Sequence, residues 1–179
     1  KYTATFNKNG ATSIWSTSLS CTWYTYNWSS STPSCTVTAP TITRAGFTIV
    51  WWSTNSGSHT ADVAVGWTIT MSANATYYAI AVTEITRTFA KNGNTSQTPN
   101  GWSANTANTL TQSCTIWNSA TTCSITSPTI TAHSNTPTVK WYSEWATNRT
   151  ITWNQATAKS VSANATYYAQ RTKDAITHT

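Results

Sequence analysis

The sequence of 179 residues has few charged side chains: Asp, Glu, Lys and Arg make up 8 % of it, against about 25 % in an average soluble domain. The net charge is +6, but the basic residues stand singly and form no stripe, which excludes a typical nucleic-acid-binding face. No apolar run approaches the roughly 20 residues of a membrane-spanning helix, so we expect no membrane insertion, and any export signal or anchor to lie outside this segment.

In chain order, the first half of the sequence reads as a series of short strands. Residues 2–6 alternate large or apolar side chains with Thr, and the Asn9-Gly10 pair then turns the chain. Residues 47–52 form the most apolar run and predict a central strand, while 77–82 predict the last one. Helix-favouring residues are scarce, so the fold class is predicted to be mainly β with little or no helix.

The second half repeats the first. The sequence SANATYYA at 72–79 returns unchanged at 162–169, and Phe6 in its Asn-Gly context corresponds to Phe89. This long period predicts two tandem small domains rather than the turns of a solenoid. We expect repeat domain 1 at 1–83, repeat domain 2 at 84–172 and the start of a further repeat at 173–179, so the sequence reads as a slice of a longer array.

Four Cys residues stand two to a repeat. A modular repeat favours pairing within each unit, Cys21 with Cys35 and Cys114 with Cys123, although spacing alone leaves the pairings between units open. Neither pair has the CxxC spacing of a zinc site, so we expect disulfides and an oxidising, extracellular compartment. Closing a loop of about 15 residues should contribute roughly 3 kcal/mol, which suits domains close to the lower size limit.

The repeat resembles the Listeria-Bacteroides repeat, the family that includes the internalin B-repeat of bacterial surface proteins. The resemblance rests on residues 2–10, 39–43, 46–52 and 75–79 of the first repeat; in the second, Trp141-Tyr142 stands in place of Trp51-Trp52. It implies small β-grasp-like domains that act as spacers or weak adhesion modules on a cell surface. The Cys pairs depart from the family's pattern.

A second departure concerns tryptophan. The family pattern has Gly where this chain has Trp51 and Trp141, and Trp is abundant (11) while Gly is scarce (6). Because some bacterial lineages read the UGA codon as glycine, one hypothesis is that several Trp letters are recoded glycines. The alternative is that they are genuine aromatic residues, packed in the core or displayed on the sheet.

Groups that could catalyse a reaction are few. The carboxylates are Asp62, Glu84, Glu144 and Asp174, and no acidic pair, nucleophile motif or phosphate loop accompanies them. His59 and Asp62 could contact a metal ion, but a solvated loop explains them more simply. The sequence therefore predicts a protein that is not an enzyme and that uses no cofactor or metal.

We expect instead an extracellular, non-enzymatic repeat module that acts as a stalk, fibre segment or adhesin rod, with neighbouring repeats as partners. One alternative is a carbohydrate-binding module that stacks cell-surface glycans on Trp23, Tyr24, Tyr26 and Trp28. Another is a filament in which the terminal strand at 175–179 pairs with another copy. Of five glycosylation sequons, those at Asn74 and Asn164 share one place in the repeat and are the candidate glycan sites.

Overall fold

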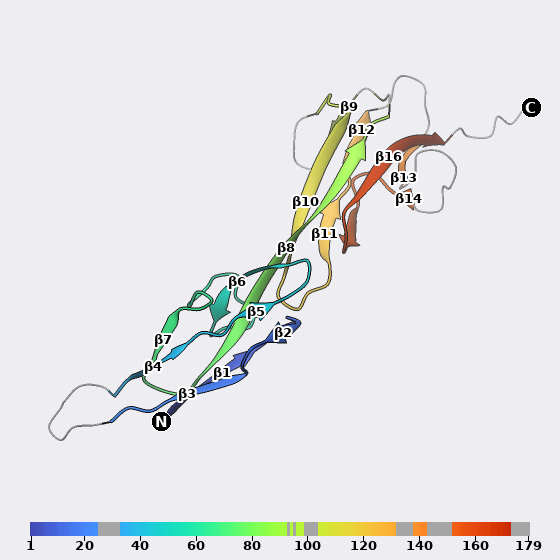
Figure 1. Cartoon of the computed structure of the whole chain (residues 1–179). Helices are drawn as coiled ribbons and strands as arrows, with labels where there is room; N and C mark the ends of the chain where they lie inside the picture. The colour runs from blue at the N-terminus through green and yellow to red at the C-terminus, as the bar shows by residue number, and fades with distance from the viewer. Residues whose placement is uncertain are drawn as a thin grey trace, which may run out of the picture. The chain divides into compact units, whose positions relative to one another are not determined.

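The computed structural model describes residues 1–24, 33–92, 94, 96–98, 104–131, 138–142 and 152–172. These residues form strands and turns and no helix, which confirms the predicted mainly β class (Figure 1). The first half contains β1 (Tyr2–Asn7), β2 (Ser13–Ile14), β3 (Ser18–Cys21), β4 (Cys35–Thr38), β5 (Ile42–Thr43), β6 (Thr48–Ser53), β7 (Thr68–Met71) and β8 (Ala75–Ala90). The second half contains β9 (Ser96–Thr98), β10 (Thr109–Trp117), β11 (Cys123–Thr126), β12 (Thr129–Thr131), β13 (Thr138–Tyr142), β14 (Thr152–Trp153), β15 (Ala158–Val161) and β16 (Ala165–Thr172).

The chain divides into two compact units. Unit 1 consists of Lys1–Thr83 and Ile116–Ala120, and unit 2 consists of Glu84–Thr115 and Thr121–Thr179. Unit 1 therefore contains a segment from further along the chain, whereas the predicted domains 1–83 and 84–172 are contiguous. That each repeat folds by itself stays a prediction, and the predicted start of a further repeat at 173–179 lies outside the described residues.

Unit 1 is organised around a parallel pair made by its first and last strands. β1 and β8 run side by side from the pair Ala4↔Ala75 to the pair Asn7↔Tyr78. β3 lies antiparallel on the other edge of β1, and β6 pairs antiparallel with β8. Two smaller antiparallel pairs, β4–β7 and β2–β5, complete the unit.

Unit 2 repeats this plan with the second part of β8 as its first strand. β8 and β16 run parallel from the pair Arg87↔Ala165 to the pair Ala90↔Tyr168. β13 pairs antiparallel with both β16 and β14, and β10 pairs with β8. The smaller pairs are β11–β15 and β9–β12. The parallel pairing of first and last strands is thus common to both units.

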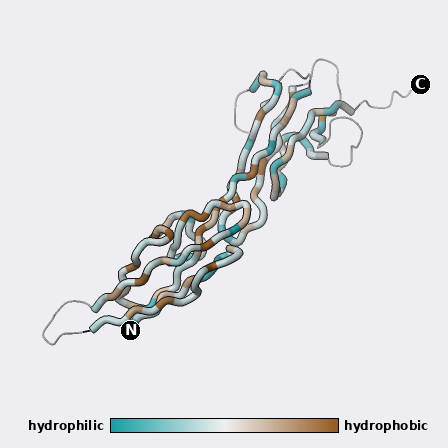
Figure 2. Tube along the Cα trace, viewed as in Figure 1, coloured by the Kyte–Doolittle hydropathy of each residue, from teal (hydrophilic) through white to brown (hydrophobic). Residues whose placement is uncertain are grey.

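β8 places buried residues at alternate positions within each unit. In unit 1, Tyr77, Ala79 and Ala81 are buried and so is Ile80 between them; in unit 2, Ile85, Arg87 and Phe89 are buried. Successive side chains of a strand point to opposite faces, so the odd-numbered residues of each unit share one face within that unit. Figure 2 shows that hydrophobic and hydrophilic stretches occur along the same strands.

Three aromatic side chains form the centre of unit 1. Phe6 meets Trp52 edge to face at a centroid distance of 5.0 Å and stacks on Tyr77 at 5.6 Å. Trp52 is fully buried, and its indole N–H donates to the Pro40 carbonyl at 3.1 Å, so the one polar group of the side chain is satisfied. Aliphatic residues surround the trio: Val37, Ile42, Ile69 and Met71.

Unit 2 reproduces the trio with different residues. Phe89 meets Trp141 at 5.0 Å and Tyr167 at 5.8 Å, and the Trp141 N–H donates to the Pro128 carbonyl at 3.0 Å. Trp153 adds a fourth ring, 5.5 Å from Phe89 and 5.2 Å from Tyr167. The aromatic core is therefore a property of the repeat.

The register corrects one correspondence predicted from the sequence. Trp141 pairs with Ala169 as Trp52 pairs with Ala79, so the counterpart of Trp141 is Trp52 and not Trp51. A β-bulge between Ile49 and Trp51 adds a residue to the first repeat and causes the error. Trp51 is 40 % exposed. The recoding hypothesis for Trp51 and Trp141 stays a prediction, but a glycine at 141 would empty a position that an indole fills and hydrogen-bonds.

Candidate functional site

Both predicted disulfides are confirmed, and each joins the strands at one end of a loop. Cys21 at the end of β3 bonds Cys35 at the start of β4, with a Cα–Cα distance of 5.7 Å. Cys114 in β10 bonds Cys123 at the start of β11, with a Cα–Cα distance of 5.9 Å. In unit 1 this bond ties the strands around β1 to the separate β4–β7 pair, so two sheets cannot part while it is intact.

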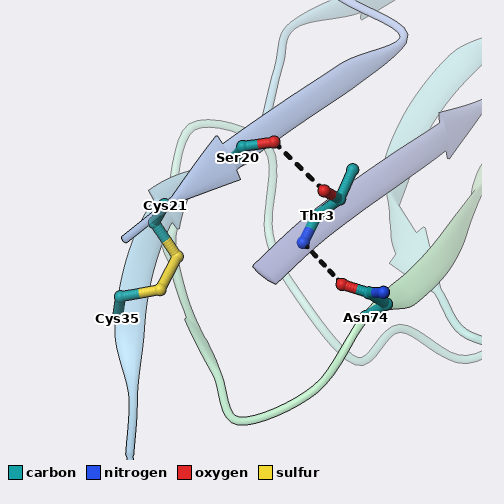
Figure 3. The surroundings of a disulfide bond; sticks show 5 residues. All are labelled: Thr3, Ser20, Cys21, Cys35 and Asn74. Carbon is teal, nitrogen blue, oxygen red and sulfur yellow. Dashed lines mark hydrogen bonds between the residues drawn. A yellow bond between two sulfur atoms is a disulfide. The ribbon is translucent and has the colours of Figure 1, made fainter. Parts of the chain in front are cut away.

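Beside the first disulfide, an asparagine side chain extends the parallel ladder of unit 1 (Figure 3). The ladder begins at Ala4↔Ala75, and one residue earlier the Thr3 N–H donates to Asn74 Oδ1 at 2.8 Å. The Thr3 hydroxyl lies 3.1 Å from that of Ser20 on β3. Asn74 therefore binds β1 at the point where β8 has not yet begun.

The second repeat contains the same device. The Thr86 N–H donates to Asn164 Oδ1 at 2.9 Å, just before the β8–β16 ladder begins at Arg87↔Ala165. Asn74 and Asn164 thus share one place in the repeat because each side chain accepts a hydrogen bond from the backbone just before a parallel ladder begins. Both residues are exposed, and the bond uses Oδ1 rather than Nδ2, the atom to which a glycan would be attached. The sequon at Asn94 differs, because Asn94 is buried and its Nδ2 donates to the Lys91 carbonyl at 2.6 Å.

The predicted sugar-stacking residues are only partly brought together. Trp23 is partly buried and stacks on Tyr2 at 6.5 Å with an interplanar angle of 25°, so one of its faces is already used. Tyr24 is 87 % exposed. Tyr26 and Trp28 lie outside the described residues.

His59 and Asp62 each have other partners in unit 1. Asp62 Oδ2 accepts hydrogen bonds from the Thr54 N–H at 2.7 Å, the Thr54 hydroxyl at 2.9 Å and the Ser53 hydroxyl at 3.1 Å. These bonds, above all the one from the Thr54 backbone, hold the pKa of Asp62 below its usual value. His59 instead stacks on Trp117 at 4.3 Å. Nowhere in the described part of the chain do three His, Cys, Asp or Glu side chains gather in a way that could hold a metal ion.

Two functional features escaped the sequence reasoning. One is the parallel pairing of first and last strands, which alternation alone cannot reveal because it gives no strand order. The other is the segment Ile116–Ala120, which packs within unit 1. An Asn-Ser pair between two strands signals a turn, but nothing in the sequence indicates what that turn contacts.

Among the described residues no helix is long and apolar enough to cross a membrane. Comparisons of the chain with models of protein families, with curated proteins and with solved structures found no match. Function must therefore be inferred from the geometry.

Proposed function

We propose that the chain is a non-enzymatic, load-bearing repeat module of an extracellular protein, such as a stalk, a fibre segment or an adhesin rod. The observation that carries the proposal is the parallel pairing of the first and last strands in each unit. The proposal includes the resemblance to the Listeria-Bacteroides repeat and the β-grasp-like fold that this resemblance implies.

Parallel terminal strands resist tension along the chain in a particular way. The chain enters unit 1 at one end of β1 and leaves it at the other end of β8, so a pull on the two ends slides one strand along the other. Every hydrogen bond of the ladder is then loaded at once. In an antiparallel hairpin pulled at its open end, by contrast, the bonds break one after another.

The remaining features fit the same role. β8 leaves the ladder with β1 and enters the ladder with β16 without an intervening loop, so tension passes directly from one ladder to the next. The two disulfides shorten the length of chain that force can extend. Disulfides also persist mainly in oxidising compartments, which supports an extracellular location.

Single-molecule force spectroscopy tests the proposal. With handles at residues 1 and 172, we expect unfolding forces several times those measured with handles at residues 1 and 22. The second geometry peels the antiparallel β1–β3 pair from the end where Tyr2 faces Cys21. Reduction should lengthen the extension per event by roughly 50 Å in unit 1 and 30 Å in unit 2, at about 3.6 Å per released residue. Equal forces in the two geometries would contradict a load-bearing role.

Carbohydrate binding is the second candidate, supported by the nearly complete exposure of Tyr24 beside the Tyr2–Trp23 stack. A glycan array with the wild-type chain and with Trp23→Ala, Tyr24→Ala and Trp28→Ala variants tests it. Binding that these variants lose would favour this candidate, and an absence of binding would favour the stalk. The filament alternative rests on 175–179, which lie outside the described residues.

A further inference from the structure

The segment Ile116–Ala120, called the Asn118 turn below, is a compact part of unit 1. The Ala120 N–H donates to the Trp117 carbonyl at 3.0 Å and closes the turn. Asn118 has a φ of 52°, a left-handed conformation that Asn tolerates better than most residues. Ile116 and Asn118 are 2 % and 7 % exposed, so these two residues are packed, whereas Ser119 and Ala120 are exposed.

Asn118 is held by four hydrogen bonds to unit 1. Its backbone N–H donates to the Ala81 carbonyl at 2.8 Å, and its Oδ1 accepts from the Ala81 N–H at 3.4 Å. Its Nδ2 donates to the carbonyls of Ser56 at 3.3 Å and Ser58 at 3.2 Å. The side chain at position 118 must therefore accept a hydrogen bond through one atom and donate two hydrogen bonds through another. Among the standard side chains, only a primary amide does both.

The residues around Asn118 complete a socket for the turn. The Trp117 ring stacks on the His59 ring at 4.3 Å and 10°. Arg44 Nη2 donates to the Ala120 carbonyl at 3.2 Å. Gly10 lies so close that a Cβ there would stand 2.8 Å from Ser119 Cα. The turn socket is formed by Gly10, Arg44, Ser56, Ser58, His59 and Ala81.

The chain on both sides of the Asn118 turn is joined by a disulfide. Cys114 and Cys123 enclose the turn with a sequence separation of 9. A cross-link over so short a loop leaves the turn few other conformations, so less entropy is lost when the turn enters its socket.

We propose that unit 1 requires the Asn118 turn as a docking element for its stable fold, and that the Cys114–Cys123 disulfide holds the turn in the conformation that fits the turn socket. Unit 1 is then sensitive to the redox state of a disulfide that lies outside it. Unit 1 thus recognises an amide-bearing turn that lies further along the sequence than the rest of the unit.

Two glycines give a matched test in the full chain. Gly10→Ala and Gly46→Ala place a side chain at similar left-handed conformations, φ 92° and 76°, but a Cβ at Gly46 meets nothing within 4 Å. Hydrogen exchange at the Asn118 and Ala81 amides should accelerate about fivefold more in Gly10→Ala, the factor that one lost hydrogen bond represents. Amides of the β11–β15 ladder report whether unit 2 remains folded. Equal exchange in the two variants would contradict the proposal.

The disulfides give a second, independent test. In the Cys114→Ser, Cys123→Ser double variant we expect faster exchange at Asn118, Ala81 and residues 56–59 of unit 1. The Cys21→Ser, Cys35→Ser double variant should leave the Asn118 amide protected as long as unit 1 stays folded. Asn118→Asp, which keeps the acceptor but removes both side-chain donor contacts, should accelerate exchange as the first double variant does. Unchanged exchange at Asn118 and Ala81 without the Cys114–Cys123 bond would overturn the role assigned to that disulfide.

Discussion

Unit 1 and unit 2 hold an aromatic trio in nearly identical geometry but surround it differently. The angle between the Phe and Trp rings is 67° in unit 1 and 68° in unit 2, and the Phe and Tyr rings are inclined at 23° and 22°. By contrast, Val63 pairs with Trp52 where Trp153 pairs with Trp141.

The first strand differs even more. Ala4 and Arg87 occupy the same register position, opposite Ala75 and Ala165, and both are buried. The repeat therefore keeps the geometry of the trio and its hydrogen bond to a proline carbonyl, while the residues next to the trio are free to change.

The largest expected effect is on the trio itself. Trp52→Ala and Trp141→Ala should each lower the free energy of unfolding by about 3–5 kcal/mol, the usual cost of removing a buried Trp. Trp51→Ala should cost under about 1 kcal/mol, because that side chain is substantially exposed. Urea unfolding followed by far-UV circular dichroism measures all three. A large effect at Trp51 would refute the correspondence of Trp141 with Trp52.

Removing either disulfide should cost about 3 kcal/mol, and the cost should be slightly smaller for the shorter loop. The comparison is between the Cys21→Ser, Cys35→Ser and the Cys114→Ser, Cys123→Ser double variants, both measured by urea unfolding. If the Cys114–Cys123 bond supports both units, its loss should broaden the transition of unit 1 as well as that of unit 2. Separate effects would indicate two independent units.

A substitution at Arg87 tests whether the residues around the aromatic trio can change without loss of stability. Its side chain donates to the Ala163 carbonyl, but its Nε is buried without a hydrogen-bond partner. Arg87→Met replaces a buried cation by a shorter, flexible apolar chain, and should raise the free energy of unfolding of unit 2 by about 1 kcal/mol. Thermal unfolding measures it, with Lys140→Met, a partly buried cation of the same unit, as the control. Destabilisation beyond about 2 kcal/mol would mean that unit 2 depends on this cation.

The asparagines before the last strands should give smaller and equal effects. Asn74→Ala and Asn164→Ala each remove a hydrogen bond to the backbone and should cost about 1 kcal/mol. Asn74→Asp and Asn164→Asp keep the acceptor and should be nearly neutral, while removing the sequon. Both series should be produced in a host that glycosylates proteins and in one that does not. The mass then shows whether a glycan is attached, and thermal unfolding shows whether the hydrogen bond to the ladder stabilises the unit.

Asp62 should produce the smallest effect, and one confined to unit 1. The pKa of Asp62 is lower in the folded chain than in the unfolded chain. Its contribution to the free energy of unfolding is therefore complete above the unfolded pKa and is lost as the pH falls through the folded pKa. We expect stability to decline with acid below about pH 4 and Asp62→Asn to reduce that decline. The register places Thr152 at the equivalent position of unit 2. An unaltered acid response of the variant would contradict the role of this carboxylate.

The sequence predicted the class of the fold and the turn at Asn9-Gly10 because these depend on local alternation and turn residues, and it predicted the disulfides because each repeat contains two Cys residues. It could not place the strands in order, since a period of two gives the faces of a strand but not its neighbours. The correspondence of Trp141 with Trp51 was wrong because a bulge changes the residue count without a sequence signal. The role of Asn118 was missed because its partners, Ser56, Ser58 and Ala81, are distant in sequence.

The buried positions of β8 in unit 2 have a consequence for changes of length within a repeat. An insertion of one residue between Arg87 and Phe89 would turn these two side chains to opposite faces, and one of them would leave the core of unit 2. An insertion of two residues there would preserve the faces. Within this part of the strand, a change of length is therefore tolerated only where it preserves the parity of the residue count.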